Sequence, residues 1–316
     1  MTGDETEFKH VSVLATESID ALNIKDDGTY VDGTLGGGGH ASLICRKLSE
    51  KGTFIGIDRD IEALEVAQKR LSIYKCDQVF ENRNYTEIKN ILDRNGIAGI
   101  DGGLLDLGVS SFQLDNVRRG FSYMNDAPLD MRMNSKDELT AEKVVNTYSE
   151  GELTKIIKKY GEERWAARIS KFIVQARKEL PITSTGQLTD IIKAAIPASA
   201  RRDGPHPAKR TFQAIRIEVN DELSPLEKAL EDFVDVLNPG GRLAVISFHS
   251  LEDRTVKEVF KTREDPCTCP KELPECVCGK VGDVRRISRK PIIAGEEELE
   301  NNPRSRSAKL RILEKI

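Results

Sequence analysis

The sequence lacks several features that would each indicate a class of protein. No run of apolar residues approaches the ~18 that a transmembrane helix needs. The first residues, "MTGDETEFKH", are polar and acidic where a secretory signal would be basic and then apolar. Basic residues number 48 against 52 acidic ones, so the net charge of −4 gives no overall attraction for polyanions. We therefore expect a cytoplasmic protein that makes no membrane contact.

Cysteine is also scarce, with six in 316 residues, too few for the disulfide framework of a small secreted protein. Four of them nevertheless lie close together, at Cys267, Cys269, Cys276 and Cys278. Paired thiolates that flank a short proline-containing turn suit a closed tetrahedral site, so a structural zinc ion is one interpretation. Reduced thiols are the second and disulfides the third, since a cytoplasmic compartment disfavours disulfides.

Strand and helix patterns alternate over two parts of the chain. Amphipathic patterns predict helices over 40–52 and 61–71, and "NPGG" (238–241) is expected to end a later helix. Strands that alternate with helices are typical of an α/β fold with a doubly wound parallel sheet. The predicted strands cover residues 28–34, 53–60, 102–111 and 242–248, with a closing edge strand over 307–316.

Between these parts, residues 115–215 show helical patterns without a convincing buried strand. The stretches "SEGE" (149–152) and "STGQ" (184–187) fit the capping boxes that begin helices. We therefore expect an inserted all-helical domain for substrate recognition over 115–215. The α/β domain is then assembled from residues 1–114 and 216–316.

The stretch "VDGTLGGGGH" (31–40) places a glycine-rich turn between a predicted strand and a predicted helix. This is the first unit of a nucleotide-binding sheet, in which free amides at the helix N-terminus face the ligand and glycine lets the backbone approach it. Asp58 ends the second strand about 20 residues later, where an acid binds ribose hydroxyls. The pattern predicts a ribose-containing cofactor.

Two such cofactors fit this turn. Gly36, Gly38 and Ala41 match G-x-G-x-x-A, the dinucleotide fingerprint, so a nicotinamide-dependent oxidoreductase is the alternative. Asp32, however, stands before the glycines, where the ligand needs a partner for an amine or a cation. The stretch "LNPGGRLAVISF" (237–248) is also typical of class I methyltransferases that use S-adenosylmethionine. We therefore favour S-adenosylmethionine as the cofactor.

Longer motifs are more specific, among them "YVDGTLGGGGHASLI", "LLDLGVSSFQLD", "HPAKRTFQAIRIEVN" and "PGGRLAVISFHSLEDR". With them the chain resembles, from His10 to Ile312, the bacterial ribosomal RNA small-subunit methyltransferase H family. The resemblance implies N4-methylation of a cytidine in the decoding region, at the P site, of 16S small-subunit ribosomal RNA. The implied partner is that RNA in an assembled or nearly assembled 30S particle. A non-catalytic RNA-binding protein is disfavoured by the intact cofactor motifs, and monomer and homodimer both stay open.

The resemblance also implies a set of cofactor contacts. They are Gly38, Gly39 and His40 in the turn, Asp58 as the ribose acid, and Tyr85, Asp106 and Gln113. Asp32 and Gly36 join this set because of their places around the turn.

The implied chemistry needs hydrogen-bond acceptors, because the lone pair of a cytosine N4 amine is delocalised into the ring. The sequence lacks the Asn/Asp-Pro-Pro-aromatic motif of many amino-methyltransferases and has "DLGVSS" (106–111) instead. Asp106 is the first candidate acceptor, with Ser110 and Ser111 next; a pure cofactor contact is the alternative for Asp106. His249 follows the last core strand, where it could bind RNA, carry a proton or make a structural hydrogen bond.

RNA contact is expected at "ARRDGPHPAKRTF" (200–212), which has the composition of a basic loop. Phosphates would attract its charges and a base would stack on its aromatic ring, the alternative being a solvated loop. The candidate residues are Arg201, Arg202, Lys209, Arg210 and Phe212. A weaker basic cluster lies at Arg285, Arg286, Arg289 and Lys290.

Overall fold

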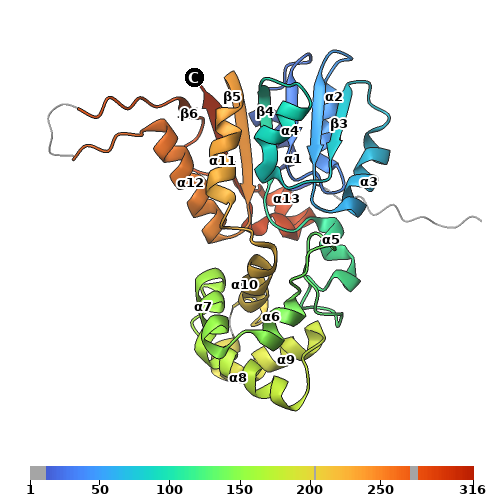
Figure 1. Ribbon diagram of the computed structural model, residues 1–316, viewed down its shortest axis with the longest axis vertical. Helices are drawn as coiled ribbons and strands as arrows, with labels where there is room; N and C mark the ends of the chain where they lie inside the picture. Colours follow the sequence, from blue (N-terminus) through green and yellow to red (C-terminus); the bar gives the residue numbers. More distant parts are fainter. Residues whose placement is uncertain (1–11, 203, 271–276) are drawn as a thin grey trace, which may run out of the picture. The chain divides into compact units, whose positions relative to one another are not determined.

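The computed structural model describes residues 12–202, 204–270 and 277–316 (Figure 1). The chain divides into two compact units, an α/β unit from the residues up to Gly108 together with Pro225–Ile316, and a helical unit over Val109–Ser224. The helical unit is thus wider than the expected insertion. Val109 and Leu114 pack against its core, and the helix α10 (Lys209–Asn220) runs across the expected boundary at residue 215.

Within the described residues, the α/β unit is built on a seven-stranded sheet in the order β3-β2-β1-β4-β5-β7-β6 (Figure 1). The strands from β3 to β5 pair in parallel, whereas β7 is antiparallel to both β5 and β6. This is the topology of class I methyltransferases. The strands are β1 (Thr29–Asp32), β2 (Thr53–Ile57), β3 (Asp77–Glu81), β4 (Ile100–Asp106), β5 (Leu237–Ser247), β6 (Val284–Arg286) and β7 (Lys309–Lys315).

All five predicted strands are therefore present, but two details were wrong. The closing strand β7 does not form the edge, because the short strand β6 pairs with its outer side. The "NPGG" stretch (238–241) lies inside β5, and the preceding helix already ends at Asp235. Proline and glycine are tolerated there because the first residues of β5 sit at an irregular part of the β4–β5 ladder.

Helices cover the sheet on both faces. On one face of the sheet, Phe54, Leu104 and Ile246 pack against the helices α1, α2 and α3. On the other face, the helices α4 and α11 contact each other and Phe233 is fully buried. The helices of this unit are α1 (Ala15–Leu22), α2 (Gly39–Lys47), α3 (Ile61–Leu71), α4 (Ile88–Arg94), α11 (Leu226–Asp235), α12 (Ser250–Glu264) and α13 (Glu296–Asn301).

The helical unit has its own hydrophobic core, and its described residues contain no strand beyond a single bridge between Pro128 and Ser184. Both predicted capping boxes are confirmed, at Ser149 of α7 and Ser184 of α9. None of the helices in the described ranges combines the length and apolar composition needed to cross a bilayer. The helices of this unit are α5 (Ser111–Asp115), α6 (Ala141–Thr147), α7 (Glu150–Gly161), α8 (Ala166–Glu179), α9 (Thr185–Ala195) and α10.

Candidate functional site

The glycine-rich turn joins β1 to α2 and needs glycine for steric reasons. Gly36 and Gly38 adopt left-handed φ angles of 49° and 75°. A Cβ on Gly38 would lie 3.2 Å from the Cβ of Ala67 on α3, so a side chain would crowd the packing of α2 on α3. The N-cap residue of α2 is Gly38, which has no side chain to cap the helix, so the first amides of α2 are suited to a ligand.

Asp58, at the end of β2, holds this turn in place. Its Oδ2 accepts a hydrogen bond from the N–H of Gly36 at 2.7 Å, and its Oδ1 accepts one from the N–H of Asp60 at 2.8 Å. Burial raises the pKa of Asp58 to about 6, although both N–H groups oppose the shift. Each carboxylate oxygen can still accept a second hydrogen bond, as the ribose hydroxyls would require.

Asp32 ends the neighbouring strand β1 and is only 1% exposed. Its Oδ1 accepts a hydrogen bond from the N–H of Thr34 at 3.1 Å. Burial raises the pKa of Asp32 to about 7; the Thr34 N–H opposes the shift and the charge of Asp58 adds to it.

Asp106 ends β4 on the other side of β1, where its N–H donates to the Thr34 hydroxyl at 2.6 Å. Burial, with the charges of Asp32 and Glu252 adding to it, raises the pKa of the Asp106 carboxyl well above its usual range. Its Oδ1 is buried without a hydrogen-bond partner among the described residues. Three adjacent strands thus lead into acids whose pKa values are raised, and a nearby cation would favour their ionised forms.

Two other expected cofactor contacts border this edge of the sheet. His40 is 6% exposed; its Nε2 lies 2.9 Å from the carbonyl oxygen of Val13 and its Nδ1 lies 3.8 Å from Asp106 Oδ2. The ring therefore packs beside the acid as an orienting contact. Tyr85 opens a 3₁₀ turn after β3, and its Cβ would lie 3.1 Å from a Cβ built on Gly33, which places it beside the turn.

Ser110, Ser111 and Gln113 belong to the helical unit, at the start of α5. Ser110 Oγ accepts a hydrogen bond from the N–H of Gln113, and Gln113 Oε1 accepts one from the N–H of Ser110, each at 3.2 Å. The two side chains thus form a capping box. The side chain of Ser111 lies outside the part of the chain that the structure describes.

His249 makes the structural hydrogen bond that was one of its expected roles, as the N-cap of α12. Its Nδ1 accepts a hydrogen bond from the N–H of Glu252 at 3.3 Å, at the N-terminus of α12. Glu252 in turn accepts bonds from the N–H groups of Phe248 and His249, at 2.8 and 3.3 Å, and its Oε1 lies 3.1 Å from His249 Nε2. The capping hydrogen bond uses Nδ1, whereas Nε2 has only the close approach to Glu252 and no hydrogen-bond partner among the described residues.

The expected RNA-binding residues separate into two groups. Arg201, Arg202, Lys209 and Arg210 are exposed, as a basic surface requires. Phe212 is 3% exposed in the core of the helical unit, where its ring meets Tyr123 edge-on at 5.7 Å. The expected base stacking on Phe212 is therefore wrong, because α10 turns this side chain inward.

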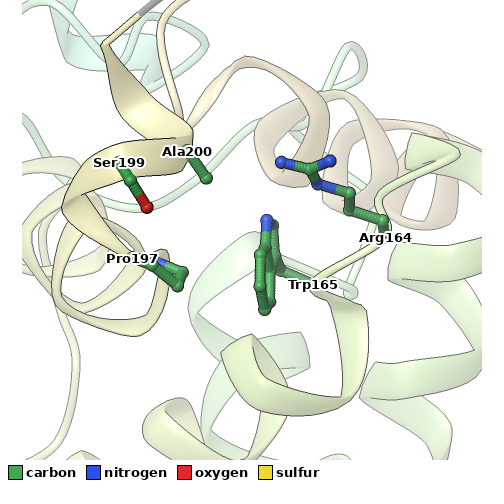
Figure 2. A pocket seen from close by; sticks show the side chains of 5 residues that line it. All are labelled: Arg164, Trp165, Pro197, Ser199 and Ala200. Carbon is green, nitrogen blue, oxygen red and sulfur yellow. The ribbon is translucent and has the colours of Figure 1, made fainter.

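Sequence analysis missed a shallow hollow of about 510 Å³ in the helical unit. Figure 2 shows the Trp165 indole and the Arg164 side chain facing Pro197, Ser199 and Ala200 across it. The Arg164 guanidinium lies over the indole, 5.3 Å from the ring centre. The indole Nε1 has no hydrogen-bond partner among the described residues. The signal in the sequence was the single tryptophan next to an arginine.

The cap assigned to His249 predicts how two variants will differ. Replacing His249 by alanine should lower the free energy of unfolding by about 0.5–2 kcal/mol, the usual cost of a lost N-cap. His249→Asn should keep both stability and turnover, because asparagine also caps helices well. Urea denaturation and turnover of both variants check this. A full loss of turnover in a stable His249→Asn protein would support a catalytic role instead.

Comparison with known proteins places this site in a family. The model of the MraW methylase family matches residues 7–316. Ribosomal RNA small subunit methyltransferase H of Clostridioides difficile (strain 630) is 58% identical over 310 residues, which cover 98% of this chain and 100% of that protein. The protein of the same name from Ruminiclostridium cellulolyticum is 57% identical over 312 residues, with the same coverage of 98% and 100%. With its class I topology and its acidic glycine turn, the chain belongs to the MraW methylase family.

Proposed function

We propose that the protein transfers a methyl group from S-adenosylmethionine to N4 of a cytidine in the decoding region, at the P site, of 16S small-subunit ribosomal RNA. The observation that carries this proposal is the set of three carboxylates around the glycine turn, those of the buried Asp32 and of the half-buried Asp58 and Asp106. The names of relatives more than half identical over nearly the whole chain support the choice of RNA.

The charges of the site favour this cofactor over a nicotinamide dinucleotide. S-Adenosylmethionine carries a sulfonium and an ammonium group, and either cation would relieve the repulsion between Asp32 and its neighbours. The pyrophosphate of a dinucleotide would add negative charge to the same edge. We therefore assign the glycines and Tyr85 to the nucleoside, Asp58 to the ribose hydroxyls, and Asp32 to the cationic end.

When bound, S-adenosylmethionine supplies an electrophilic methyl group. The protein must then orient the N4 amine so that its lone pair faces that group. Asp106 is placed to do this, because its Oδ1 is buried without a partner among the described residues and can accept an amine hydrogen. Its raised pKa also makes it a suitable acceptor for the proton that leaves N4. Ser110 and Ser111 remain second candidates.

We assign RNA binding to the helical unit. Arg201, Arg202, Lys209 and Arg210 expose charges that phosphates would attract. The hollow beside Trp165 adds an aromatic ring under a guanidinium, a combination on which an unpaired base can stack. We propose that the folded RNA of an assembled or nearly assembled 30S particle is recognised by these exposed groups.

The reaction is tested with 30S particles that lack the modification and labelled S-adenosylmethionine, followed by mass spectrometry of nucleosides. We expect N4-methylcytidine from the native protein and a fall in kcat of roughly 10²–10⁴-fold in Asp106→Asn, the range for a lost acid–base group. Asp93→Asn on the exposed surface of α4 is the matched control and should keep full activity. Methyl transfer to another position, or an active Asp106→Asn protein, contradicts the assignment.

The affinity for S-adenosylmethionine should depend on pH with a definite sign. A cationic ligand binds best when Asp58 and Asp32 are ionised, and their pKa values in the free protein are about 6 and 7. Affinity should therefore rise between about pH 5.5 and 8, with protons released on binding below pH 7. Asp58→Ala should weaken binding by about 1.5–3 kcal/mol.

Titration calorimetry in two buffers of different ionisation enthalpy measures both the affinity and the protons released. Asp93→Asn again serves as the control. Tight binding of NAD with none of S-adenosylmethionine would overturn the cofactor assignment.

The RNA assignment predicts a change in salt dependence. Neutralising Arg201, Arg202, Lys209 and Arg210 together should weaken RNA binding and reduce its logarithmic salt slope by roughly 3, because each phosphate contact contributes about 0.7–0.9. Cofactor affinity should stay unchanged. The matched control neutralises four exposed lysines elsewhere in the same unit, Lys155, Lys158, Lys171 and Lys178. Equal salt slopes for both variants, measured on 30S particles, would show that the basic loop is only solvated.

A further inference from the structure

The connection between α12 and β6 has little core of its own. Figure 1 shows its two described arms, residues 265–270 and 277–283, extending away from the sheet. Val277 and Val281 are 78% and 86% exposed, so apolar burial does little to order them. Where the arms leave the fold, Arg263 Nε donates to Asp283 Oδ1 at 3.0 Å and Arg286 Nε to Glu264 Oε2 at 2.7 Å. These ion pairs hold the two arms side by side at their base.

Three cysteines face one another further along these arms. Cys267 and Cys269 lie on the first arm and Cys278 on the second, and their three sulfurs are all within 4.8 Å of one another. The sulfurs of Cys267 and Cys278 are 3.9 Å apart. A disulfide would bring them to about 2.05 Å. Thiolates about 2.3 Å from one zinc ion in a tetrahedron lie about 3.8 Å from each other, close to the 3.9 Å between Cys267 and Cys278.

We propose that Cys267, Cys269 and Cys278 bind a structural zinc ion that joins the two arms. Thiolates are soft ligands that select zinc over magnesium or calcium. The fourth cysteine of the sequence cluster, Cys276, lies outside the described residues. Because its thiolate ligands come from both arms, the ion would order the connection.

The geometry explains why a metal is effective here. The ion pairs at the base already bring the arms together, so the ion does not have to close the whole loop against its chain entropy. Zinc binding would then order the two described arms, whose valines are exposed, as it orders small domains that depend on metal for folding.

The test uses the full-length protein, produced with zinc and desalted under a mild thiol reductant. Elemental analysis should find about one zinc per chain, and cobalt substitution should give the absorption bands of a tetrahedral thiolate site. Cys267→Ser and Cys278→Ser should each reduce bound zinc below about a tenth of that level. Cys76→Ala, which removes a buried cysteine from the core of the same unit, is the matched control and should retain the ion.

Several results would overturn the proposal. If the native protein keeps less than about a tenth of an equivalent of zinc after loading, the proposal is wrong, whatever the variants show. Full zinc retention by Cys278→Ser would also exclude the site. So would a Cys267–Cys278 disulfide in the alkylated, unreduced native protein. Circular dichroism verifies that each variant is folded. Because the readout is metal content, failure here leaves the proposed methyl transfer untouched.

Discussion

The hydrogen bond from the Gly36 N–H to the Asp58 carboxylate, 2.7 Å long, is the interaction on which the candidate site depends. It ties the glycine turn after β1 to the end of β2 and fixes the start of α2. Asp58 can serve this purpose only at the cost of partial burial, which raises its pKa to about 6. A single carboxylate therefore links the geometry of the turn to the electrostatics of the ligand edge.

Asp32 and Asp106 place two further carboxylates at the same edge of the sheet as Asp58. Parallel pairing brings the ends of β1, β2 and β4 to one edge, and each strand ends in an acid. Burial, with the charges of neighbouring acids adding to it, raises the pKa values of Asp32 and Asp106, so a bound cation would favour their ionised forms.

Local sequence signals predicted the α/β strands, the helix α3 over its full length, and both capping boxes, because each depends on residues close together in the chain. The place of β7 depends on the three-residue strand β6, which is too short to show a pattern. The burial of Phe212 depends on Tyr123, far away in sequence. The cap at His249 was readable in part, since Glu252 follows three residues later as in a capping box.

The helical unit interrupts the connection between β4 and α11, although β4 and β5 are hydrogen-bonded neighbours. The centre of the sheet can therefore form only after the chain has closed a loop that contains a whole second unit. Contacts between residues distant in sequence form slowly, whereas helices packed on their sequence neighbours form fast. We expect the helical unit to fold first and to act as a compact tether that shortens this loop.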